Sequence, residues 1–269
     1  MSAVSSIPES ISTERRVPPL GGFNLTLLGI EMKRRLRNRR NVVFAMILPV
    51  AMFLIIGLQV KDTPLDPSHP ISAGGQSVAS YIMLSMAVYG CMITATSAGG
   101  AVAIERSMGW SRQLRLTPLS PVANIAVKIV GALVLGAIAI VAVYIAGYAI
   151  GVRMAPHIWV IGALAALLGS LVFTALGLLV GYLVPSENVM QFMGPAIAFL
   201  ALFGGLFFPL DGWMKQVGVW TPTYGIGEIA RAPLTGADFN WLSLANVALW
   251  LAIFTVGAAL AFRRDTKRV

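Results

Sequence analysis

The chain has 269 residues, of which 57% are hydrophobic and only 12% are charged, and its formal net charge is +9. Soluble domains carry about 25% charged residues, so this composition excludes an ordinary soluble protein and indicates an integral membrane protein. The single cysteine excludes a disulfide scaffold, and the two histidines lie far apart with no carboxylate or thiol spacing around them, so no metal site is predicted.

The chain begins with residues 1–22, which are rich in Ser, Pro, Glu and Arg and lack an apolar core, so a disordered cytoplasmic tail is expected there. Residues 23–41 differ, because apolar side chains recur at helical spacing between basic ones: Leu25, Leu28, Met32 and Leu36. This pattern predicts an amphipathic helix lying in the inner membrane interface. It could be a topology anchor alone, or it could also touch a cytoplasmic partner.

Residues 42–262 are predicted to form an all-α transmembrane domain of six helices, because a membrane-spanning helix needs about 20 mostly apolar residues. The six apolar stretches that qualify are 42–60, 79–104, 122–150, 158–184, 189–208 and 241–262. Residues 263–269 follow as a basic tail.

The basic residues predict the orientation of these helices. Fifteen of the 20 Lys and Arg residues fall before the first stretch, between the second and third, or after the last, and Lys128 near the start of the third stretch makes sixteen. The other four fall on the opposite side: Lys61, Arg153, Lys215 and Arg231. Basic residues accumulate on the cytoplasmic side of membrane proteins, so both termini are expected to be cytoplasmic. The positive charge is therefore explained by topology and by attraction to anionic membrane lipid, and no nucleic-acid partner is predicted.

The connection between the fifth and sixth stretches is about thirty residues long and partly apolar. Glycines 204 and 205 allow a sharp turn there, and aromatic side chains suited to the headgroup level follow. We expect short re-entrant or interfacial helices on the outer side, with Phe208, Pro209 and Trp213 as an outer gate or cap. An aromatic belt without a role in transport is the alternative.

The interiors of the apolar stretches carry almost no ionisable side chain, which argues against an ion relay and favours an amphiphilic or hydrophobic substrate. Mild polar and aromatic groups are the candidates to line a route for it: Tyr81, Ser85, Tyr89, Thr96, Phe203 and Phe207. Hydroxyl groups also pack helices together, so this second interpretation stays open for them.

Residues 105–120 form a short charged segment between two long apolar stretches, and Leu and Arg alternate within it. Lipid offers polar groups no partners, so the segment is expected to be a cytoplasmic loop that docks onto a soluble partner. The chain contains no phosphate-binding loop and no Gly-Lys pair, and thus no nucleotide site of its own. Either a separate subunit supplies energy or the protein is not an active transporter.

The Glu-Arg, Gly and Leu-x-x-Thr-Pro-Leu-Ser pattern of this segment, together with the six apolar stretches and the Phe208-Pro209 segment, resembles the permease subunit of ABC transporters of the type-2 exporter class. The resemblance implies a permease subunit, and not an enzyme, that exports a drug, antibiotic or lipid across the bacterial plasma membrane. Two ATP-binding subunits would hold ATP and Mg²⁺, and a second permease copy, identical or related, would complete the assembly. The residues implied to couple to the ATPase are Glu105, Arg106, Gly109, Arg112, Leu114, Arg115, Leu116 and Pro118.

Two other functions compete with this one. A secondary carrier or facilitator would work without an ATPase, although it would usually keep ionisable groups in its membrane interior. A non-transporting membrane scaffold is the other alternative.

Overall fold

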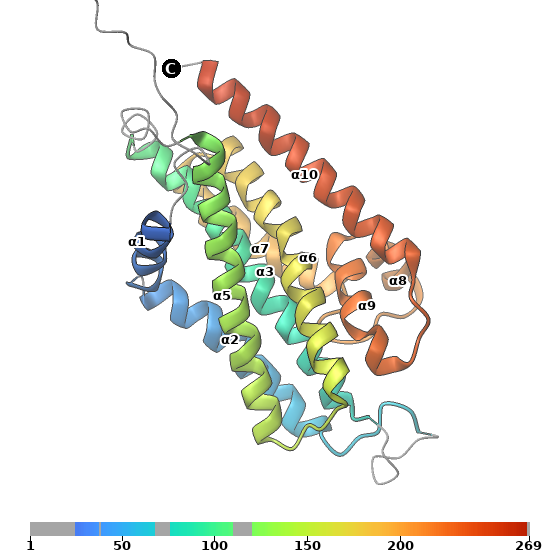
Figure 1. Ribbon diagram of the computed structural model, residues 1–269. Coiled ribbons are helices and arrows are strands. Elements are labelled where there is room, and N and C mark those ends of the chain that lie inside the picture. Colours follow the sequence, from blue (N-terminus) through green and yellow to red (C-terminus); the bar gives the residue numbers. More distant parts are fainter. Residues whose placement is uncertain (1–24, 38, 68–75, 110–119, 268–269) are drawn as a thin grey trace, which may run out of the picture.

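The computed structural model describes residues 25–37, 39–67, 76–109 and 120–267 (Figure 1). Within these ranges the chain is helical, and its only bridge between extended segments joins Pro64 and Ser77. This confirms the predicted all-α class.

The helices follow one another in the order α1 (Leu25–Arg37), α2 (Arg39–Val60), α3 (Val78–Ser107), α5 (Pro121–Ala149), α6 (Pro156–Leu183), α7 (Ser186–Phe203), α8 (Gly212–Gly218), α9 (Pro222–Thr235) and α10 (Trp241–Lys267).

Local sequence explains where several helices begin and end. Ser77 and Ser120 cap α3 and α5, each accepting a hydrogen bond from the backbone N–H three residues later. Prolines occupy the first turn of α5, α6 and α9, where the missing N–H costs nothing. Helix α7 ends at Phe203, because Gly204 caps it and Gly205 takes a positive φ of 68°.

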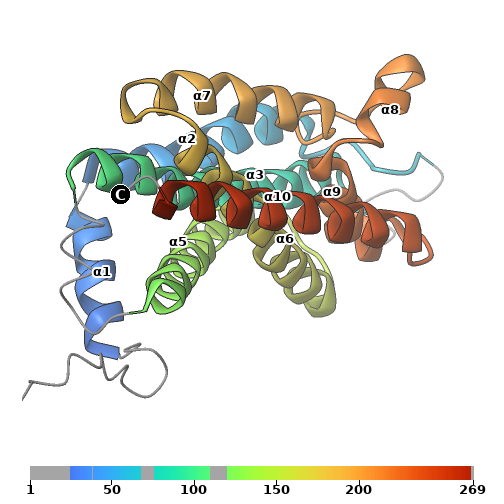
Figure 2. The same ribbon diagram turned by 90° about the horizontal axis from the view of Figure 1, so that it is seen from above.

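Helix α3 forms the centre of the bundle, and most of its side chains are buried. It packs against α6, α5 and α2, and also contacts α9 and α7. Viewed from above, α5 and α6 lie on one side of α3 while α7 and α8 lie on the other (Figure 2). Fully buried side chains from several elements fill the core, among them Phe53, Met83, Met92, Phe173 and Leu206.

Among the described residues, four helices are long and apolar enough to cross a membrane: α3, α5, α6 and α10, within 78–107, 122–149, 156–183 and 241–264. They coincide with four of the predicted stretches to within a few residues. The apolar part of α2, Ala45–Val60, is shorter than such a span. Helix α7 stops five residues before the predicted end of the fifth stretch, so the exact six-span layout stays a prediction.

The amphipathic helix predicted at 23–41 is represented by α1, in which no described residue is buried. It contacts α5 and, more weakly, α2. In Figure 2 it projects sideways from the bundle near the end where α3 finishes and α5 begins. The amphipathic pattern is only partly reflected in this packing: Leu28 and Met32 are half-buried together with Glu31 and Arg35, whereas Leu25 and Leu36 are exposed.

Candidate functional site

The end of α3 carries a buried ionic cluster, which we call the Glu105 cluster. Glu105 is only 6% exposed, and Lys128 of α5 is 2% exposed. The Lys128 Nζ donates to both carboxylate oxygens of Glu105, each at 2.7 Å. From α1, Arg34 donates from Nη2 to Glu105 Oε1 at 2.5 Å. Three helices that are far apart in sequence are therefore tied together by one carboxylate.

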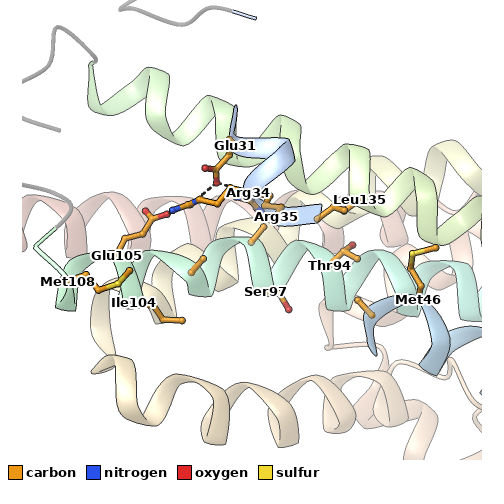
Figure 3. A pocket seen from close by; sticks show the side chains of 13 residues that line it. Glu31, Arg34, Arg35, Met46, Thr94, Ser97, Ile104, Glu105, Met108 and Leu135 are labelled. Atoms are coloured by element: carbon orange, nitrogen blue, oxygen red, sulfur yellow. Dashed lines mark hydrogen bonds and ion pairs between the residues drawn. The ribbon is translucent and has the colours of Figure 1, made fainter. Parts of the chain in front are cut away.

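Glu31 extends the cluster along α1 (Figure 3). Its carboxylate accepts hydrogen bonds from Arg34 Nη2 at 2.9 Å and from Arg35 Nε at 3.1 Å. Burial on its own would raise the pKa of Glu31, but the hydrogen bond from Arg34 and the charges of Lys128, Arg35 and Arg34 outweigh it and hold that pKa below its ordinary value. Each carboxylate of the cluster is therefore paired with Arg or Lys side chains, as burial of charges in partly apolar surroundings requires.

Arg106 holds the end of α3 against α6. Its Nη1 donates to the backbone carbonyls of Gly181 and Tyr182 at 3.1 and 2.9 Å, and its guanidinium lies 5.8 Å from the centre of the Tyr182 ring. These carbonyls belong to the last turn of α6, where helix carbonyls have no partner within the helix and attract cations. The side chain therefore caps α6 from a neighbouring helix.

The helix pair α3 and α6 is in unusually close contact because glycines face each other. A Cβ placed on Gly99 would lie 2.4 Å from the backbone nitrogen of Leu178, and one on Gly177 would lie 2.5 Å from the carbonyl oxygen of Thr96. Only glycine permits such an approach. The end of α3 that carries Glu105 and Arg106 is thus rigidly attached to α6.

Most of the predicted coupling residues follow Arg106 along the chain. Gly109 follows α3 with a positive φ of 69°, and its N–H donates to the Arg106 carbonyl. The remainder of the predicted set lies outside the described residues: Arg112, Leu114, Arg115, Leu116 and Pro118. The structure therefore brings Glu105 and Arg106 into contacts within the chain itself, and a role for the set in binding an ATPase stays a prediction.

The predicted pathway residues of α3 lie on its buried or half-buried face. Ser85 Oγ donates to the Tyr81 carbonyl at 3.0 Å, and Thr96 Oγ1 donates to the Met92 carbonyl at 2.7 Å. Tyr89 is 6% exposed. Its ring packs edge-on against Phe207, with ring centres 5.4 Å apart. These contacts fit the helix-packing interpretation, and their place on a transport route stays a prediction.

Aromatic side chains also gather around the connection after α7, which was predicted to lie on the outer side. Phe203 packs on Phe199 with ring centres 4.3 Å apart, and its ring centre lies 6.3 Å from that of Trp213. Phe208 is 41% and Trp213 is 66% exposed, and Pro209 is exposed as well. The predicted gate residues therefore lie at the surface of the chain.

Arg231 of α9 is a buried charge that the sequence interpretation counted only as an outer basic residue. It is 3% exposed. Its Nη1 donates to Ser85 Oγ at 2.9 Å and to the Gly205 carbonyl at 3.3 Å, and its Nη2 pairs with Glu228 at 3.2 Å. Its guanidinium also lies 4.5 Å from the centre of the Tyr81 ring. One side chain thus joins α3, α9 and the turn after α7.

Comparison with known proteins adds the family. The family described as "ABC-2 type transporter" matches residues 24–231. The chain belongs to the ABC-2 type transporter family. It is a multi-pass membrane protein and a transport permease. It is also 27% identical, over 229 residues, to a Bacillus subtilis protein described as a putative transport permease, YvfS; the match covers 83% of this chain and 90% of that protein.

Two features of the permease site were not predicted from sequence. The sequence indicates that Lys128 and Glu105 lie near the same membrane face, but it does not indicate that they pair directly. Glu228 and Arg231 are three residues apart in a helix rich in Gly and Pro, and this spacing was the available signal for a local ion pair. The described residues bring together no group of three or more His, Cys, Asp or Glu side chains that could hold a metal ion.

Proposed function

We propose that this chain is the transmembrane subunit of an ATP-driven exporter, powered by two copies of a separate ATP-binding subunit. It moves an amphiphilic or hydrophobic substrate, such as a drug, an antibiotic or a lipid, out of the cytoplasm or inner leaflet by alternating access. A second permease copy, identical or related, completes the assembly in the bacterial plasma membrane, with both termini cytoplasmic. Membership in the ABC-2 family supports the transport role.

The observation that carries the coupling proposal is the attachment of the α3 end. The segment between Gly109 and Ser120 leaves from α3 and enters α5. At its borders, Glu105 links α3 to both α5 and α1, and Arg106 links α3 to α6. A force applied to that segment would therefore act on several helices as one unit, which is what a rigid-body switch between two states requires.

ATP can drive this switch only if the ATPase binds the two permease states with different affinity. The alternating Leu and Arg residues of 110–119 offer apolar anchors and positive charges to such a partner. The scarcity of ionisable side chains in the apolar stretches supports the substrate class, because membrane interiors that move ions usually contain ionisable groups.

Single-cysteine crosslinking tests the proposal. In a Cys91→Ser background, Leu114→Cys is crosslinked in native membranes and captured proteins are identified by mass spectrometry. Lys215→Cys, an exposed site in α8, serves as the control on the predicted opposite face. We expect an ATPase with a phosphate-binding loop to be captured at position 114 only, and ATP to change the yield. Capture of no ATPase from a cytoplasmically accessible 114 would refute the coupled exporter.

Coupling itself is tested by charge reversal at Arg112 and Arg115. We expect Arg112→Glu/Arg115→Glu to insert normally and to lose ATP-dependent export. Export that persists in the absence of ATP and collapses with an ion gradient would favour the secondary carrier.

A further inference from the structure

A cavity of about 260 Å³ opens beside the Glu105 cluster, between α1, α2, α3 and α5 (Figure 3). One part of its wall is apolar and comes from α2, α3, α5 and the turn after α3: Met46, Ala98, Ala101, Ile104, Met108 and Leu135. The volume is slightly below the about 300–1,000 Å³ typical of small-molecule sites, so it suits a head group and the first part of a tail but not a whole amphiphile.

The other part of the wall is charged. Arg34, Arg35, Glu31 and Glu105 line it, and Lys128 lies directly behind Glu105. The two lining arginines balance the two lining carboxylates, and Lys128 behind Glu105 leaves one positive charge in excess. An apolar cavity with a net positive end favours an anionic amphiphile over a neutral or zwitterionic one.

Arg35 is only partly satisfied by the described residues. It is 10% exposed, and its Nε donates to Glu31 at 3.1 Å. Its Nη2 is buried, and no described residue accepts a hydrogen bond from it. Buried guanidinium N–H groups are normally satisfied, so an unpaired one indicates an acceptor that completes the site.

The position of Arg35 is determined by packing. A Cβ on Gly131 of α5 would lie 3.2 Å from Arg35 Nε, so the guanidinium lies closely against the backbone of α5 at this glycine. The side chain is therefore held between α1 and α5 beside the cavity. A planar guanidinium held in this way matches the oxygens of a phosphate or carboxylate.

We propose that this cavity binds the anionic head group and proximal tail of an amphiphile taken from the cytoplasmic leaflet, with Arg35 as the binding residue and Arg34 beside it. The apolar wall of α2 and α3 receives the tail. Binding needs no ATPase, so a failure of this inference leaves the proposed coupling intact, and a failure of coupling leaves the binding site intact.

The test measures binding of dodecyl phosphate to the purified full-length permease in an uncharged detergent by native mass spectrometry. Dodecylphosphocholine, with the same tail and a zwitterionic head, is the ligand control, and inorganic phosphate is the control for the tail. Arg35→Gln removes the charge, and Ala101→Phe fills the apolar wall. Arg37→Gln removes a charge from the same helix at an exposed position that does not line the cavity.

We expect dodecyl phosphate to bind the wild type, and Arg35→Gln to weaken that binding about tenfold or more, because a charge-assisted hydrogen bond is lost. Ala101→Phe should block it, while Arg37→Gln should change it less than about twofold. Dodecylphosphocholine and inorganic phosphate should bind poorly. If Arg35→Gln misfolds, Ala101→Phe decides the result.

Two sources of the ligand are distinguished by what the protein carries after purification. An anionic phospholipid that co-purifies with the wild type and is absent from Arg35→Gln would identify a membrane lipid. A site that is empty on purification yet binds dodecyl phosphate would identify an exchangeable amphiphile. Equal binding by the wild type, Arg35→Gln and Ala101→Phe, or equal binding of the zwitterion, would overturn the proposal.

Discussion

The ion pair between Glu105 and Lys128 makes the sharpest prediction about stability. The perturbation is a double-mutant cycle built from Glu105→Gln, Lys128→Met and the two together. The two side chains are 8% and 2% exposed, so each carries its charge out of water and depends on the other for compensation. Removing one partner leaves the other as a poorly compensated buried charge.

The structure indicates that the two single substitutions differ in how much unfolding free energy they remove. Breaking a buried pair costs about 3–5 kcal/mol. After Lys128→Met, Glu105 still accepts from Arg34, whose side chain is 45% exposed, so this change should destabilise the protein by about 3 kcal/mol. After Glu105→Gln, the ammonium of Lys128 loses the negative charge that compensates it and one of its two acceptor oxygens, so this change should destabilise the protein by about 5 kcal/mol. The double variant should lose less than the sum, because it buries no unpaired ammonium.

Thermal unfolding in detergent measures these losses. Cys91 is the only cysteine and is fully buried, so a thiol-reactive fluorophore reports unfolding without an introduced cysteine. At about 2–4 °C per kcal/mol for domains of this size, the single variants should lower Tm by roughly 6–20 °C. Lys33→Met, an exposed charge removed from α1, is the matched control and should change stability by less than about 0.5 kcal/mol.

Two outcomes would refute the reasoning. Single variants that stay within about 2 °C of the wild type would show that the pair is not buried as described. A cycle that is additive within about 0.5 kcal/mol would show that the two groups do not interact.

Three further predictions concern other parts of the chain. In the fold the pKa of Glu31 lies below its ordinary 4.5, so the stability that its charge contributes is present above pH 4.5 and is lost as the pH falls through the lowered pKa. Glu31→Gln should therefore have a lower Tm than the wild type at neutral pH. The difference in Tm, measured over a series of pH values, should shrink on acidification. Gly99→Ala should destabilise the protein by about 1–3 kcal/mol in a thermal unfolding assay, because it forces α3 away from α6. The control Gly194→Ala, whose Cβ would meet nothing within 4 Å, should not. Equal Tm values for the two variants would contradict the close contact. Arg231→Met should cost about 1.5–3 kcal/mol through its lost hydrogen bonds to Ser85 and the Gly205 carbonyl, and the exposed Lys215→Met is its control; an unchanged Tm for Arg231→Met would exclude a structural role.

The sequence showed where much of the candidate site lies along the chain, but not which of its side chains contact one another. The pattern of 105–120 indicated a cytoplasmic segment at the end of an apolar helix, and the structure places the end of α3 and the start of α5 on its two sides. The pattern could not show that Glu105 is buried, because its neighbours come from α1 and α5. Arg34 is 71 residues away along the chain, and Lys128 is 23 residues away.

Local chemistry determines the all-α class and the four long apolar helices. Apolar stretches of sufficient length, serine caps and first-turn prolines act over a few residues, so the bounds of α3, α5, α6 and α10 were predictable from local chemistry. Tertiary structure alone decided which faces meet. Hydropathy shows that a face is apolar but does not distinguish lipid from another helix as its cover, and Arg231 reaches Ser85 across 146 residues only because α9 packs on α3.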